Sequence, residues 1–125
     1  MTVEYCWEPK GIYIRFSGSI TGVGILAAAL DASGDPRFDD ISYALVDLFD
    51  ARSSTVNAED MKQMAAYVSA MSLTNPRIKN AIVMFPDNEE RSALAGLYQM
   101  LTDNLPWEIK LFETLDAARE WTDDR

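Results

Sequence analysis

Histidine is absent from this sequence of 125 residues, and cysteine occurs once, as Cys6. Without histidine there is no Ser-His-Asp or Cys-His catalytic set, and a zinc site of the usual ligand types is excluded. A single cysteine also excludes an intrachain disulfide and a CxxC metal site. Because Cys6 is out of phase with the apolar residues around it, we interpret it as a structural thiol rather than a nucleophile. We therefore expect a protein that is not an enzyme and that uses no cofactor and no metal ion.

Positive charge is scarce: 11 Lys and Arg residues stand against 20 Asp and Glu residues, which gives a formal net charge of -9. The basic residues are scattered along the chain and form no patch in the sequence. An acidic protein repels both phosphate backbones and anionic lipid headgroups. We therefore expect no binding to nucleic acid or to a membrane surface.

Long hydrophobic runs are absent as well. The most apolar stretch, GVGILAAAL at 22–30, is too short to span a bilayer. The first residues, MTVEYCWEPK, do not have the basic and then apolar pattern of a signal peptide. Together with the single cysteine, which fits a reducing compartment, these features predict a cytoplasmic protein that is not an integral membrane protein.

Apolar residues make up 48% of the chain, enough to build one core, and we expect residues 1–125 to form a single domain. Alternating apolar residues predict a β-hairpin over 3–8 and 11–17, with EPKG as its turn. The spacing then becomes helical, since Val23, Leu26, Ala27 and Leu30 fall on one face. This predicts a helix that begins after Thr21 and ends at Gly34 and Pro36.

The second half of the chain alternates between apolar runs and amphipathic segments. The runs at 41–49 and 80–85 predict strands that are covered on both faces, as in the centre of a parallel sheet. Residues 107–112 alternate and predict a strand near the edge of the sheet. Three further helices are predicted, each with a capping residue: one over 58–72 with Asn57 as its cap and Met61, Met64, Ala65, Val68 and Met71 inside; one capped by Asp87, with Glu90 in a capping box and Leu94, Leu97, Tyr98 and Leu101 inside; and one capped by Thr114.

The predicted order is ββαβαβαβα. It implies an α/β fold with a five-stranded mixed, mostly parallel sheet, four helices, and the first strand antiparallel at one side. Five stretches also look familiar: GIYIRFSGSIT (11–21), GDPRF (34–38), ALVDLFD (44–50), NAIVMFPD (80–87) and FETLDAAREW (112–121). With these stretches, the chain resembles the SpoIIAA-like family of the STAS superfamily. That superfamily includes anti-sigma factor antagonists and is related in fold to the Sec14/CRAL-TRIO lipid-binding domains.

In the antagonists that the chain resembles, a kinase phosphorylates a serine at the start of the second helix, within an Asp-Ser-Ser-Gly motif. The added charge either is stabilised by the helix N-terminus or blocks a docking surface. Ser53 and Ser54 are the nearest candidates, but the equivalent position falls near Val56 and Asn57, and no glycine follows. An acidic first turn at 59–60 would also repel a phosphate, so the sequence does not predict this phosphorylation.

In an open parallel sheet, ligands bind at the carboxyl ends of the strands, and polar loops such as DARSST (50–55) follow the predicted strands there. We also considered a structural role. For Thr21, Asn57, Asp87 and Thr114 we favour helix capping, whereas both interpretations stay open for Asp50, Arg52, Ser53 and Ser54. The residues that we assign to a partner or ligand surface are Asp50, Arg52, Ser53, Ser54, Thr55, Asn57 and Asp87.

Three functions remain. The leading hypothesis is a non-enzymatic binding or regulatory module that contacts a partner protein around residues 50–60. The alternative is a carrier or sensor of a small lipophilic ligand, for which a face containing Met61, Met64 and Met71 would be adaptable, although core packing also explains these residues. The second alternative is a carboxylate-dependent enzyme in which Asp50 and Asp87 act as acid and base or hold a divalent cation. A homodimer is compatible with the sequence, which does not decide it.

Overall fold

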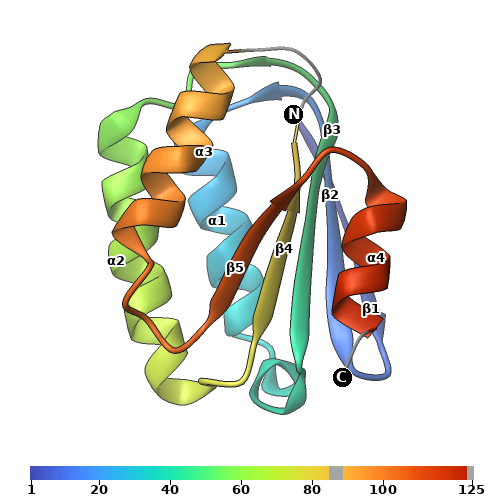
Figure 1. The fold of residues 1–125 in the computed structure, drawn as a ribbon. Coiled ribbons are helices and arrows are strands. Elements are labelled where there is room, and N and C mark those ends of the chain that lie inside the picture. Colours follow the sequence, from blue (N-terminus) through green and yellow to red (C-terminus); the bar gives the residue numbers. More distant parts are fainter. Residues whose placement is uncertain (85–88, 124–125) are drawn as a thin grey trace.

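In residues 1–84 and 89–123, which the computed structural model describes, five strands form one mixed sheet in the order β1-β2-β3-β4-β5 (Figure 1). The antiparallel edge strand is β1 (Thr2–Glu8), which pairs with β2 (Gly11–Ile20). The strands β3 (Tyr43–Ser54), β4 (Lys79–Val83) and β5 (Glu108–Phe112) follow in parallel, with β5 at the other edge. The predicted mixed sheet with an antiparallel first strand is therefore confirmed.

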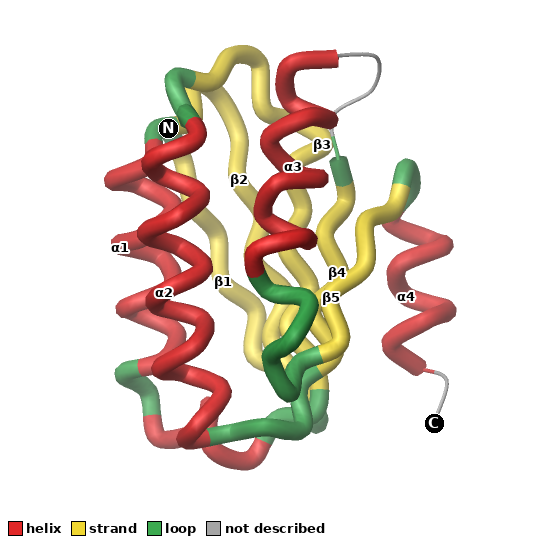
Figure 2. Tube along the Cα trace, turned by 60° about the vertical axis from the view of Figure 1, so that its left-hand side comes forward, coloured by secondary structure: helices red, strands yellow, loops and turns green. Residues whose placement is uncertain are grey.

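Helices cover the sheet unequally. On one face lie α1 (Gly22–Ser33), α2 (Ala58–Thr74) and α3 (Glu89–Leu101), whereas α4 (Leu115–Asp123) is the one described helix on the other (Figure 2). A short 3₁₀ helix at Pro36–Asp40, which the sequence analysis did not predict, follows α1. No helix of the described residues is both long and apolar enough to cross a membrane.

The core has two layers because β3 and β4 carry apolar side chains on both faces. The larger layer lies under α1, α2 and α3, and the predicted inner faces of α2 and α3 are confirmed there. The smaller layer lies under α4 and contains Tyr43, Leu45, Ala81, Val83 and Ala118.

The predicted inner face of α1 is wrong. Val23 is 82% exposed and Leu30 is 49% exposed, and the helix instead packs through Ile25, Ala28, Ala29 and Ala32. This second set has the same i, i+3, i+4, i+7 spacing as the predicted one, so periodicity fits both faces equally. The structure places the smaller side chains inside.

The strands β2 and β3 are longer than predicted, and residues 50–54, which we expected in a loop, belong to β3. The pairing of β2 with β3 continues through two register shifts, the first between Arg15 and Ser17 and the second between Gly18 and Ser19. Such bulges bend a strand pair, and the two strands curve over the end of the helix layer (Figure 1). Long-range pairing with β2 thus outweighs the loop-like local composition of DARSS.

Candidate functional site

The carboxyl ends of β2 and β3 bring several predicted site residues together. We call the exposed polar side chains at this edge the rim; its members are Ser19, Asp50, Arg52, Ser53 and Thr55. The Ser53 hydroxyl donates to the Ser19 Oγ at 2.9 Å, which links the two strands. The backbone N–H of Thr55 donates to the carbonyl of Ile20 at 3.0 Å and extends this pairing to the start of the β3–α2 connection. The rim is therefore held by strand pairing rather than by a free loop.

Asp50 is engaged in an ion pair, which bears on the predicted carboxylate chemistry. Arg15 donates through Nε to the Asp50 Oδ2 at 3.0 Å and through Nη1 to the Glu4 Oε1 at 2.7 Å. These hydrogen bonds raise the pKa of Arg15, which stays charged. The other carboxylate of that hypothesis, Asp87, lies outside the described residues. Within the ranges 1–84 and 89–123, no three His, Cys, Asp or Glu side chains are grouped so as to hold a metal ion.

The N-terminus of α2 is closed by its own capping box. The Asn57 Oδ1 accepts from the N–H of Asp60 at 3.0 Å, and the Asp60 Oδ2 accepts from the N–H of Asn57 at 3.0 Å. The first residue of α1 packs directly against it, since a Cβ added at Gly22 would clash with the Asp60 carboxylate. Because a carboxylate already occupies the helix N-terminus, an added phosphate at Ser53 or Ser54 would meet negative charge there.

The predicted caps that fall in the described residues are present. The Thr21 Oγ1 accepts from the N–H of Gly24 at 3.0 Å, and the Thr114 Oγ1 accepts from the N–H of Ala117 at 3.2 Å. Asn57 thus has a structural role, which accounts for its side chain without a ligand. Ser54 also differs from the rim, because its half-buried hydroxyl accepts from the N–H of Val56 at 3.1 Å.

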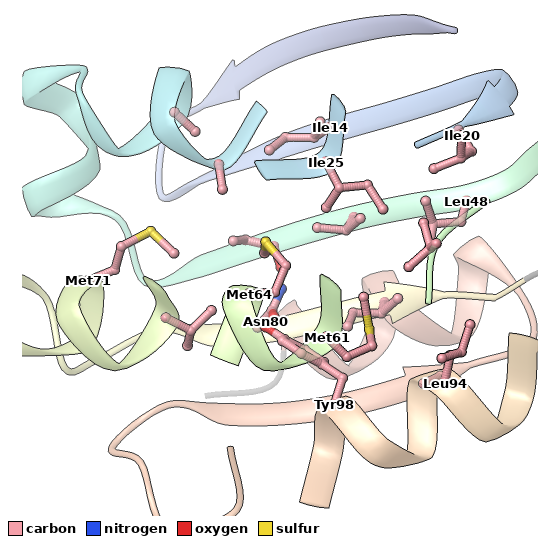
Figure 3. Close-up of a pocket in the computed structure, with 18 of the residues that line it drawn as sticks. Ile14, Ile20, Ile25, Leu48, Met61, Met64, Met71, Asn80, Leu94 and Tyr98 are labelled. Carbon is pink, nitrogen blue, oxygen red and sulfur yellow. Dashed lines mark hydrogen bonds between the residues drawn. The ribbon is translucent and has the colours of Figure 1, made fainter. Parts of the chain in front are cut away.

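Beneath the rim, between the sheet and the three-helix layer, lies a cavity of about 150 Å³ (Figure 3). The sheet side of its wall comes from β2, β3 and β4, and the helix side comes from α1, α2 and α3. The lining is almost entirely apolar, and its polar side chains among the described residues are those of Ser54, Asn80 and Tyr98, with the indole of Trp107. Labelled lining residues in Figure 3 include Ile14, Ile25, Leu48, Met61, Met64 and Leu94.

The sequence explains why this space is left open. The inner face of α1 contributes short side chains, including Ala29 and Ala32, which reach only a little way toward the sheet. Val46 therefore remains half-buried, although it lies in the middle of β3 under the helices. Flexible Met61 and Met64 supply the opposite wall. The face of α2 that contains Met61, Met64 and Met71 therefore belongs both to the core and to the cavity wall.

A polar pair in the cavity wall was missed by the sequence analysis. The Asn80 Nδ2 donates to the carbonyl of Ala44 at 3.0 Å, and the Tyr98 hydroxyl donates to the Asn80 Oδ1 at 3.3 Å. Burial raises the pKa of Tyr98, so its hydroxyl is neutral. The available signal was Asn80 itself, since it is the polar residue of the apolar run NAIVMF and shares a strand face with Ile82.

The opposite face of the sheet is closed by hydrogen bonds. The Tyr13 hydroxyl donates to the Asp47 Oδ2 at 2.6 Å, and the Asp47 Oδ1 accepts from the N–H of Phe49 at 3.0 Å. Nearby, Arg119 of α4 donates through Nη2 to the Glu8 Oε2 at 2.8 Å, and Tyr43 donates to the same carboxylate. The hydrogen bonds from Arg119 lower the pKa of Glu8. On this face, therefore, both oxygens of the buried Asp47 carboxylate accept hydrogen bonds, and Glu8 is paired with Arg119.

Comparison with known proteins gives a fold. No protein-family model matches the chain, and no curated protein matches it. Among solved structures, the anti-sigma factor antagonist SpoIIAA in its unphosphorylated form superposes with a TM-score of 0.61 at 8% identity, covering 99% of this chain and 100% of that one. An uncharacterized protein from the DUF3478 family, with a SpoIIAA-like fold and from Shewanella loihica, gives a TM-score of 0.52 at 16% identity, covering 97% and 92%. Over essentially its whole length, the chain therefore has the SpoIIAA-like fold that its sequence resembled.

Proposed function

We propose that this protein is a non-enzymatic regulatory module that binds a partner protein through the rim. The observation that carries the proposal is the exposure of Arg52, Ser53 and Thr55 on a paired, curved strand end. A rigid polar surface of this kind needs little ordering on association. The fold of an anti-sigma factor antagonist supports a protein partner by analogy.

An exposed aromatic residue supports the same surface. Phe49 precedes Asp50 in the irregular stretch of β3 and is 49% exposed. Aromatic and arginine side chains are the residue types that contribute most to protein–protein binding energy. We therefore propose Phe49 and Arg52 as the main contacts, with the serine hydroxyls as polar contacts around them.

The proposal is tested by site-specific crosslinking in the cells that make the protein. A photoreactive residue in place of Ser53 is compared with one in place of Leu73, which is 84% exposed near the other end of α2. We expect a partner that crosslinks from position 53, does not crosslink from position 73, and is lost with Phe49→Ala or Arg52→Glu. Equal labelling from both positions, or enzymatic turnover that disappears with Asp50→Ala, would refute the proposal.

A second function is favoured by the cavity: sensing of a small lipophilic ligand. Pockets for drug-sized ligands measure roughly 300–1,000 Å³. Because this cavity is only about 150 Å³, it suits a sensor of a compact molecule better than a carrier of a long-chain lipid. Native mass spectrometry of protein purified from its source cells tests this function, and we expect a small adduct that organic extraction removes.

The remaining expectations are proposals of the same kind. We propose a cytoplasmic location, which cell fractionation tests. A homodimer stays a prediction, and light scattering at several protein concentrations tests it. A carboxylate-dependent enzyme is disfavoured, because Asp50 is held in an ion pair with Arg15.

A further inference from the structure

We infer that the cavity is a binding site for a compact, uncharged, mainly apolar molecule of about six to eight non-hydrogen atoms, which carries one hydroxyl group that it donates to the Tyr98 oxygen. The inference rests on the second proposed function and names the ligand class. Three properties of the cavity lead to it: its size, the absence of charged side chains among the described residues that line it, and the chemistry of its polar pair.

Size sets the upper limit. Apolar cavities of roughly 150 Å³ in other proteins stay dry and accept molecules such as benzene or xenon. The cavity here has that volume, and half-buried side chains such as Leu48, Met84 and Leu94 line its part near the carboxyl ends of the strands. The thioethers of Met61 and Met64 can change rotamer to follow the shape of a ring or a branched chain. A long acyl chain occupies more than this volume.

Charge sets the second limit. None of the described residues that line the cavity is Asp, Glu, Lys or Arg. Transfer of an ion from water into such a site is strongly unfavourable, because nothing there pairs with it. The ligand is therefore neutral, and a carboxylate analogue of the same size is excluded.

The polar pair determines which functional group is accepted. The Tyr98 proton points to the Asn80 Oδ1, and the Asn80 amide is held by the carbonyl of Ala44. Among the described residues, no donor reaches the Tyr98 oxygen, so this oxygen is an acceptor on the cavity wall (Figure 3). A ligand hydroxyl supplies the missing donor, whereas a ligand carbonyl finds no free proton at this atom.

The test uses the full chain and three probes of similar size: benzene, phenol and benzoate. We expect benzene and phenol to bind, as measured by calorimetry and by chemical-shift changes of lining methyl groups, and benzoate not to bind. Tyr98→Phe should weaken phenol by about fivefold, the value of one hydrogen bond, and leave benzene unchanged. Tyr67→Phe is the matched control, because its hydroxyl lies 2.8 Å from the Ser33 Oγ, outside the cavity.

A filling variant tests the location. Ala29 lines the cavity, whereas Ala27 is exposed on the same helix. Ala29→Leu should abolish binding of both probes, and Ala27→Leu should retain it. Xenon-induced shifts of the methyl groups in the unmodified protein locate the site even if a variant does not fold.

Several results would overturn the inference. They are a failure of both benzene and phenol to bind at millimolar concentration, binding of benzoate comparable to phenol, or equal loss of both probes in Tyr98→Phe. A small apolar adduct without a hydroxyl group in the native mass spectra, together with no phenol binding, would uphold the sensing function and refute the ligand class. The two failures are therefore distinguishable.

Discussion

The two faces of the sheet are built from alternate residues of the same strands, yet they are packed differently. The face under α1, α2 and α3 is apolar and leaves a cavity of about 150 Å³. The face under α4 is filled by a small apolar cluster and by the hydrogen-bonded groups Tyr13–Asp47 and Arg119–Glu8. The difference indicates that one face is adapted to repacking and the other to rigidity.

Truncating one leucine on each face of β3 should give the largest difference in stability between the two faces. Leu45 is fully buried under α4, whereas Leu48 is half-buried at the cavity. Leu45→Ala should cost about 3–4 kcal/mol of unfolding free energy, and Leu48→Ala about 1–2 kcal/mol, because its neighbours already lack contacts on the cavity side. Urea denaturation measures both, and equal costs would mean that the two faces are packed alike.

Enlarging an alanine should give the next largest difference. Ala81 and Ala118 are both fully buried in the cluster under α4, which leaves no room for extra atoms. Ala81→Leu should cost about 3 kcal/mol or more through overpacking. Ala29→Leu at the cavity should change stability by less than about 1 kcal/mol. Thermal denaturation measures both variants, and a similar loss of stability in the two would contradict the presence of the cavity.

The buried carboxylate of Asp47 should stabilise the fold through the two hydrogen bonds that it accepts. Asp47 is 5% exposed and satisfies the Tyr13 hydroxyl and the N–H of Phe49. Asp47→Ala leaves these two donors without an acceptor and should cost about 2–3 kcal/mol, whereas Asp47→Asn keeps one acceptor and should cost less. If denaturant titration showed Asp47→Asn to be less stable than Asp47→Ala, the hydrogen bonds at this position would not stabilise the fold.

The Glu8–Arg119 pair gives the polar face a pH dependence. Hydrogen bonds from Arg119 lower the pKa of Glu8 below its ordinary value of 4.5. The resulting stabilisation, about 1 kcal/mol for a partly buried pair, is complete above pH 4.5 and disappears as the pH falls through the folded-state pKa. Stability curves of wild type and Glu8→Gln should therefore converge in acid, and a constant difference from pH 7 to pH 3 would exclude this pair as the cause.

Much of this architecture follows from sequence patterns, and the misses have physical causes. The order of elements, the antiparallel first strand and the inner faces of α2 and α3 follow from periodicity and capping residues. The extension of β3 through residues 50–54 did not, because it depends on pairing with the polar end of β2. The cavity could not be predicted either, because no pattern within one segment tells how much space remains between the short side chains of α1 and the sheet.

The face of α1 is the sharpest case, because two sets of residues share one helical spacing, and Val23→Ala on this helix gives the smallest expected effect. Val23 is 82% exposed, while Ile25 lines the cavity. Val23→Ala should change the free energy of unfolding by less than about 0.5 kcal/mol, and Ile25→Ala should cost about 1–2 kcal/mol. If urea denaturation gave the reverse order, α1 would present the face expected from its larger side chains. The cavity would then be filled by Val23 and Leu30, and the contrast between the two faces of the sheet would be lost.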